Sequence, residues 1–133
     1  MWHEFRRAGL AFLAMLVTAS ALAGDPASVA RVSQDTLLAR QAKHDPELVV
    51  LDVRTPEEFA AGHVPGAINV PHDQLAANLG KVPRDKDIVV YCRSGRRTDI
   101  ATGILVDNGY RRVAHLDGDM NAWLENARPL EKL

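Results

Sequence analysis

The fold is decided by the stretch DIVVYCRSGRR at residues 87–97. Its first half holds a continuous apolar run rich in β-branched residues, Ile88, Val89 and Val90, which is typical of a buried strand in a parallel sheet. The run ends at Cys92, the only cysteine of the chain, and polar residues follow it. The stretch therefore predicts a central strand over 87–92 and a tight loop over 93–97.

A helix is expected directly after this loop, from Thr98 to Asp107. Apolar residues recur there at helical spacing and predict one buried face, formed by Ile100, Ala101, Ile104 and Leu105. The pair Asn108-Gly109 ends the helix, since glycine adopts the left-handed conformation of a helix end without steric cost. The predicted order is thus strand, loop and helix, with the cysteine where the strand meets the loop.

This position predicts an electropositive environment for Cys92. A loop that closes onto a helix N-terminus directs unpaired backbone N–H groups into one small volume, and the helix dipole adds positive charge there. Gly95 allows the backbone to approach closely, and Arg93, Arg96 and Arg97 supply three guanidinium groups. Such an environment favours the thiolate form of a cysteine, and the same donors hold an oxyanion.

A simpler interpretation of Cys92 competes with this one. A free cysteine is often only a small buried apolar residue, and arginine runs are often solvated surface. Cys92, however, ends a strand at the edge where open α/β sheets place their ligand sites. We therefore expect a nucleophilic sulfur at the base of an anion-binding loop.

Residues 1–23 have the pattern of a secretory signal peptide. Two arginines precede an uncharged run from Ala8 to Ala23. The run ends in Ala21-Leu22-Ala23, which has small residues at the two positions that a signal peptidase recognises before its cleavage site. The uncharged run is shorter than the roughly 20 residues of a membrane span, so an uncleaved anchor is the second choice. We expect export to the periplasm, a mature chain that starts near Gly24, and no stable membrane association after cleavage.

The rest of the chain, residues 24–133, has the size and balance of one ordinary domain. Loss of residues 1–23 would leave 14 of the 16 basic and 16 of the 17 acidic residues, a balance near neutrality that does not favour nucleic acid as a partner. With one cysteine the chain can form no internal disulfide. A domain of this length buries its own core without metal or disulfides.

Strand and helix patterns alternate along this domain. Further strands are expected at 48–51, 67–71 and 112–116, and further helices at 33–43, 55–60, 72–79 and 120–125. Thr55-Pro56-Glu57-Glu58 is a strong helix start, with a capping threonine, a proline at the first helical position and acids at the positive end. The alternation predicts an α/β fold with a mainly parallel sheet that helices cover on both faces.

Three stretches in order resemble the single-domain rhodaneses, the thiosulfate sulfurtransferase family: LDVRTPEEFAAGHVPGAINVP (51–71), VVYCRSGRR (89–97) and HLDGDMNAW (115–123). The resemblance covers nearly all of residues 24–133. It implies a rhodanese-like domain whose central sheet has five strands. It also implies that Cys92 takes a sulfane sulfur from thiosulfate or a related small sulfur oxyanion as a persulfide. The sulfur then passes to cyanide or a thiol, with a thioredoxin-like protein among the candidate acceptors.

The resemblance also implies roles for the residues of the loop. Arg93 and Arg97 bind the sulfonate of the donor, Arg96 assists at the rim, and Ser94 and Gly95 complete the substrate-binding loop, whose backbone N–H groups stabilise the persulfide. No cofactor is implied.

Asp52 and Arg54 follow the strand at 48–51 and are candidate supports of the loop. A buried ion pair with a structural role is the favoured interpretation of these two residues, since most such pairs are structural.

The sequence departs from the family pattern at two positions. The turn before the tryptophan usually reads Gly-Gly, whereas Asp119 follows Gly118 here. If this position needs a positive φ, aspartate tolerates it better than most residues do. Thr98 stands where a serine is common, which is a mild chemical change.

The histidines do not predict a metal site. His63 lies in a turn and resembles a structural position of the family. His44, His72 and His115 show no metal-ligand spacing with one another or with Cys92.

Two other functions compete with sulfur transfer. A cysteine phosphatase or arsenate reductase also attacks an oxyanion from a cradled thiolate, but its Cys-x5-Arg loop would place an arginine at Thr98. An exported sulfur-carrier or binding module without significant turnover would keep the same cysteine and arginines. Slow turnover of thiosulfate together with rapid transfer to one partner would favour the carrier.

Overall fold

The computed structural model describes residues 29–133. The predicted signal peptide, residues 1–23, and the domain boundary at Gly24 lie outside the described residues. Within 29–133, no helix has the length and apolar character that a membrane crossing requires.

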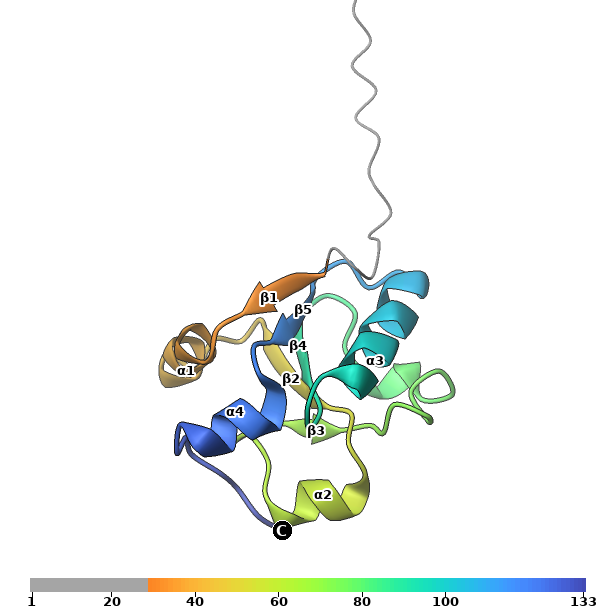
Figure 1. Ribbon diagram of the computed structural model, residues 1–133. Helices are drawn as coiled ribbons and strands as arrows, with labels where there is room; N and C mark the ends of the chain where they lie inside the picture. The colour runs from red at the N-terminus through yellow and green to blue at the C-terminus, as the bar shows by residue number, and fades with distance from the viewer. Residues whose placement is uncertain (1–28) are drawn as a thin grey trace, which may run out of the picture.

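Five strands form one sheet in the order β1-β5-β4-β2-β3, and every neighbouring pair is parallel (Figure 1). The strands are β1 (Ala30–Val32), β2 (Leu48–Asp52), β3 (Ile68–Asn69), β4 (Asp87–Tyr91) and β5 (Val113–Leu116). The helices are α1 (Gln34–Ala42), α2 (Pro56–Ala61), α3 (Arg96–Asp107) and α4 (Asp119–Glu125), with a 3₁₀ helix η2 (Leu79–Lys81) before β4. The predicted α/β fold with a five-stranded sheet is therefore confirmed, and the sheet is wholly parallel.

The core lies on both faces of this sheet because side chains alternate along each strand. In β4, Ile88 and Val90 belong to the cluster that packs against α3, whereas Val89 and Tyr91 belong to the cluster that contains Trp123 of α4. Helices therefore cover both faces, as the alternating pattern predicted. The buried strand at 87–92 is the centre of the molecule, with both of its faces covered.

The predicted helix start at Thr55-Pro56 is also confirmed, and α1 begins with a side-chain cap as well. The Ser33 hydroxyl accepts a hydrogen bond from the Thr36 N–H at 3.1 Å and caps α1. At α2, the Thr55 side chain accepts from the Glu58 N–H, and the Glu58 carboxylate accepts from the Thr55 N–H, so a complete capping box is present. This box fixes Glu58 at the start of α2, next to the loop after β4.

Several element predictions were wrong. The segment 72–79 is a series of turns instead of a helix: its amides bond three residues back, from Gln74 to Pro71 and from Asn78 to Leu75, and the buried Leu75 fixes it to the core. The strand expected at 67–71 shortens to β3. The edge strand β1 was not predicted, because its exposed Ala30-Arg31 has no apolar pattern.

The helix after Cys92 also differs from its prediction. It begins at Arg96, two residues early, because Gly95 is already its N-cap. Ile100 was expected in the buried face but is 41% exposed, and the face consists of Thr98, Ala101, Thr102 and Leu105. The loop itself is therefore only Cys92–Gly95, shorter than predicted.

Candidate active site

The candidate site lies at the point of the sheet where the connections after two neighbouring strands lead to opposite sides. From β2 the connection runs through α2 outward to β3, whereas from β4 it runs through α3 to β5 on the other side. A crevice forms between such connections at the carboxyl ends of the strands, which is where ligands bind in parallel α/β sheets. Cys92 follows β4 at this edge, Arg54 follows β2, and Glu58 lies in the first turn of α2.

The sulfur of Cys92 receives a backbone hydrogen bond at the N-terminus of α3. The Gly95 N–H donates to Sγ at 3.0 Å, and the side chain is buried. Gly95 has φ 119°, a conformation that side chains rarely adopt. A Cβ at this position would also lie 3.2 Å from Oδ2 of Asp119, so glycine is required both for the turn and for the space below it.

The predicted anion-binding side chains of the loop and of the start of α3 differ in burial and pairing. Arg93, Ser94 and Arg96 are exposed, and among residues 29–133 the guanidinium of Arg93 has no ion-pair partner. Arg97 is half-buried and forms a bidentate pair with Glu58, with Nη–Oε distances of 2.6 and 3.0 Å. This pairing uses two of its five N–H donors and leaves others for a ligand.

Sequence reasoning missed Glu58 as a part of the site. The hydrogen bond from Arg97 lowers the pKa of Glu58 to about 2, and the bond from the Thr55 amide acts in the same direction. Glu58 is therefore ionised at neutral pH and holds Arg97 in place. The capping box at residues 55–58 fixed the position of this carboxylate, but nothing in the sequence indicated which arginine it would face.

Asp52 and Arg54 form the buried ion pair that was expected of them. Oδ2 of Asp52 accepts from Arg54 Nη2 at 2.7 Å and from the Tyr91 hydroxyl at 2.7 Å. Arg54 also donates to the Gly62 carbonyl at 2.8 Å, beyond the end of α2. Burial and Asp52 raise the pKa of Tyr91 well above its usual range, so its hydroxyl stays a donor. The pair thus joins β2, β4 and the end of α2 beside the loop.

A second buried carboxylate, Asp119, lies on the other side of the loop. Its Oδ1 accepts from the Cys92 N–H and from the Thr98 hydroxyl, each at 2.9 Å, and its Oδ2 lies 2.8 Å from His115 Nε2. Burial opposes ionisation of Asp119, but hydrogen bonds from His115 and from the Cys92 amide outweigh it and hold its pKa below the usual range. The sequence indicated Asp119 only as a tolerated departure from the family pattern and indicated no role for His115.

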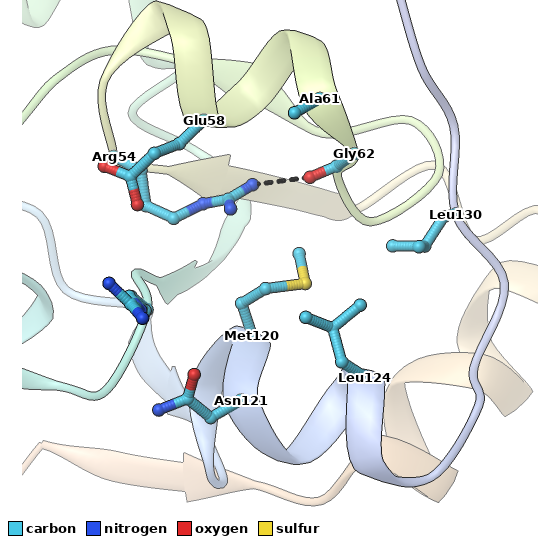
Figure 2. Close-up of a pocket in the computed structure, with 9 residues that line it drawn as sticks. Arg54, Glu58, Ala61, Gly62, Met120, Asn121, Leu124 and Leu130 are labelled. Atoms are coloured by element: carbon cyan, nitrogen blue, oxygen red, sulfur yellow. Dashed lines mark hydrogen bonds between the residues drawn. The ribbon is translucent and has the colours of Figure 1, made fainter.

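A cavity of about 400 Å³ opens beside the loop (Figure 2). Its lining is Arg54, Glu58, Ala61, Gly62, Arg93, Met120, Asn121, Leu124 and Leu130. Figure 2 shows Arg54 and Glu58 at one side of this space and Met120, Leu124 and Leu130 at the other. The cavity therefore has a charged wall next to Arg93 and an apolar wall from α4 and the C-terminal segment. Over residues 29–133, no group of three or more His, Cys, Asp or Glu side chains has a metal-binding arrangement.

Comparison with known proteins identifies the family of the chain. The chain matches the family model described as Rhodanese-like domain over residues 33–126. A protein named Sulfurtransferase from Allochromatium vinosum is 36% identical over 102 residues, which cover 77% of this chain and 94% of that protein. Thiosulfate sulfurtransferase 16, chloroplastic, from Arabidopsis thaliana is 38% identical over 117 residues, which cover 78% of this chain and 92% of that protein.

A solved structure gives the same fold. The crystal structure of a rhodanese-related protein from Thermoplasma volcanium superposes with a TM-score of 0.68 at 26% identity and covers 77% of this chain and 97% of that one. The family match spans the segment from the cap of α1 to the end of α4, including the Cys92 loop and every residue of its supporting network. The chain belongs to the rhodanese-like domain family.

Proposed function

We propose that the protein is a sulfurtransferase in which Cys92 carries the transferred sulfur as a persulfide. The observation that carries the proposal is the 3.0 Å hydrogen bond from the Gly95 N–H to the sulfur at the N-terminus of α3. A backbone donor and a helix N-terminus both favour negative charge on that sulfur. Relatives named as sulfurtransferases support the same reaction class.

The proposed reaction has two nucleophilic steps. The Cys92 thiolate attacks the outer sulfur of thiosulfate, the S–S bond of the donor breaks, and sulfite leaves with the electron pair. A thiolate or cyanide then attacks the outer sulfur of the persulfide and forms a bond to it. The bond between that sulfur and Cys92 Sγ breaks, and its electron pair returns to Cys92. No net oxidation occurs and no cofactor is needed. The backbone N–H groups of the loop stabilise the anionic sulfur in both steps.

The donor is proposed to be a small sulfur oxyanion held by the loop arginines. Arg93 is exposed and lines the cavity, and Arg97 keeps N–H donors beside its pair with Glu58. The acceptor is proposed to be cyanide or a thiol, including a thiol on a thioredoxin-like protein, and the cavity next to Arg93 is the space open to it. We also propose that the chain acts in the periplasm, on the strength of the pattern at residues 1–23.

Intact mass of the protein recovered from the periplasm tests this proposal. We expect the mass of a chain without residues 1–23, a gain of about one sulfur atom after thiosulfate, and loss of that gain after cyanide. No gain together with release of phosphate from an aryl phosphate would instead indicate a cysteine phosphatase. If the protein shows neither a mass gain nor phosphate release, it is a binding module. A gain that only one protein acceptor removes quickly would indicate a carrier. A mass that includes residues 1–23 would contradict cleavage.

Arg93→Ala is expected to weaken the use of thiosulfate. It removes an exposed guanidinium that lines the cavity. A charge-assisted contact with the donor is worth roughly 1.5–3 kcal/mol, so kcat/KM for thiosulfate should fall by at least about tenfold. Steady-state rates with thiosulfate and cyanide measure this effect. Arg111→Ala is the matched control, because Arg111 is also exposed but lines a different cavity at the opposite end of β4. An equal loss in both variants would contradict the assignment of Arg93.

A further inference from the structure

One buried carboxylate is bonded to both ends of the Cys92 loop. Oδ1 of Asp119 accepts from the Cys92 N–H at the end of β4 and from the Thr98 hydroxyl in the first turn of α3, each at 2.9 Å. The turn that carries Cys92, Ser94 and Gly95 lies between these two anchor points. The single oxygen atom therefore fixes the distance between the strand end and the helix start.

The first turn of α4 also donates hydrogen bonds to the first two carbonyl groups of the loop. The Met120 N–H donates to the Cys92 carbonyl and the Asn121 N–H donates to the Arg93 carbonyl, each at 3.0 Å. Both backbone polar groups of Cys92 are thus bonded by consecutive residues of α4, the N–H by Asp119 and the carbonyl by Met120. The orientation of the nucleophile depends on where α4 begins.

The second oxygen of Asp119 is held by a buried histidine. His115 of β5 places Nε2 2.8 Å from Oδ2 of Asp119 and Nδ1 3.5 Å from Oδ1 of Asp99 in the first turn of α3. Both His115 and Asp119 are at most 5% exposed. The carboxylate is therefore fixed at both oxygens and cannot rotate away from the loop without breaking these bonds.

The backbone of Asp119 is in a conformation that is unfavourable for aspartate. Its φ is 52°, and the preceding Gly118 has φ 72°. Left-handed backbone at a non-glycine residue costs free energy and persists where the surroundings enforce it, often beside functional sites. At this turn, where the resembling family usually has a second glycine, the chain thus carries an aspartate whose side chain contacts the loop. The three contacts of its carboxylate, with the Cys92 N–H, the Thr98 hydroxyl and His115, offset the strain.

We propose that Asp119 is a positioning residue, which acts with His115 and Thr98 to hold the Cys92–Gly95 turn in the shape that directs the Gly95 N–H at the sulfur. The space below Gly95 supports this role, because a Cβ there would lie 3.2 Å from Oδ2 of Asp119 and 3.5 Å from the His115 ring. Asp119 touches no substrate and acts through the backbone of the loop. The inference rests on the proposed sulfur transfer for its catalytic consequence, although the geometry can be tested without it.

Asp119→Gly is the test variant, with Asp119→Asn as the conservative rescue. Glycine suits the left-handed backbone but removes the carboxylate. Asparagine keeps an oxygen for the Cys92 N–H and the Thr98 hydroxyl, the two bonds that anchor the loop. We expect Asp119→Gly to speed amide hydrogen exchange at Cys92 and Gly95 at least about tenfold and to slow persulfide formation by about tenfold. We expect Asp119→Asn to stay within about threefold of the unmodified protein in both measurements.

Asp117→Gly is the matched control, because Asp117 lies in the same turn and, within residues 29–133, the ion-pair partner of its carboxylate is the exposed Arg31, at 3.7 Å. It should leave exchange and rate unchanged. Thr98→Val is the second variant, in case Asp119→Gly fails to fold: it removes one hydroxyl from the network and should slow persulfide formation less than Asp119→Gly does. Thr98→Ser should restore the rate.

The outcomes separate this inference from the proposed function. If the unmodified protein gains no sulfur but Asp119→Gly frees the Cys92 and Gly95 amides, the proposed function fails and the positioning geometry stands. Full amide protection and full rate in Asp119→Gly would overturn the inference. So would an Asp119→Asn protein as slow as Asp119→Gly, because the hydrogen-bonding oxygen would then not be what matters.

Discussion

Cys92→Ser is expected to lose the mass gain from thiosulfate completely while keeping the fold. Serine has nearly the volume of cysteine and can accept the same hydrogen bond from the Gly95 N–H, so the buried loop keeps its packing. Its hydroxyl, however, cannot form a persulfide, and the chain holds no second cysteine to replace it. Sulfur transfer to cyanide should fall to the uncatalysed rate.

Intact mass after thiosulfate and the thermal unfolding midpoint are the two measurements for this variant. Ala76→Ser introduces the same residue at an exposed turn and should load sulfur like the unmodified protein. A Cys92→Ser protein that still gains one sulfur would refute the assignment of the nucleophile. A variant that neither loads sulfur nor unfolds cooperatively would leave Cys92 with a structural role only.

The strand, loop and helix around Cys92 could be predicted because their signals are local. The apolar run over 88–90 marks a buried strand, Thr55-Pro56 marks the start of α2, and Asn108-Gly109 marks the end of α3. Each of these features depends on residues within one turn or one strand of one another. The order of the elements then limited the fold to a parallel sheet with helices on both faces.

The errors came from features that depend on distant parts of the chain. The edge strand β1 is made by its pairing with β5, more than 80 residues away, and not by its own composition. Ile100 has the helical spacing of a core residue, but Thr98 and Thr102 occupy the buried face instead, where the Thr98 hydroxyl bonds Asp119. A polar residue that finds a buried partner can displace an apolar one, and the sequence does not show that partner.

The supporting carboxylates were hidden for the same reason. Glu58 was visible as a capping residue and Asp119 as a departure from Gly-Gly, but their partners Arg97 and Cys92 are 39 and 27 residues away. A signal did exist for Asp119: a charged residue at a turn that usually contains glycine calls for a compensating contact. The sequence therefore indicated that something unusual happens there without indicating what it touches.

Asp52→Ala is expected to destabilise the domain by about 3–5 kcal/mol, because it leaves the buried guanidinium of Arg54 without its counter-charge. Asp52 is fully buried and accepts from the Arg54 backbone N–H, from the Arg54 side chain and from the Tyr91 hydroxyl. Alanine replaces none of these acceptor sites. Urea unfolding followed by circular dichroism measures the change.

Asp35→Ala is the matched control for this loss. Asp35 also pairs with an arginine, Arg128, at 2.8 Å, but its side chain is 84% exposed, and exposed pairs contribute about 0–1 kcal/mol. A similar small change in both variants would show that water or a backbone shift compensates Arg54. The hydrogen bonds of the Asp52 carboxylate go to Arg54 and Tyr91 and not to the Cys92–Gly95 turn, so the loss of Asp52 should act through folding and not through the sulfur chemistry. At temperatures where Asp52→Ala remains folded, Cys92 should still load sulfur. That result would show that the ion pair stabilises the fold, whereas the Cys92–Gly95 turn carries out the reaction.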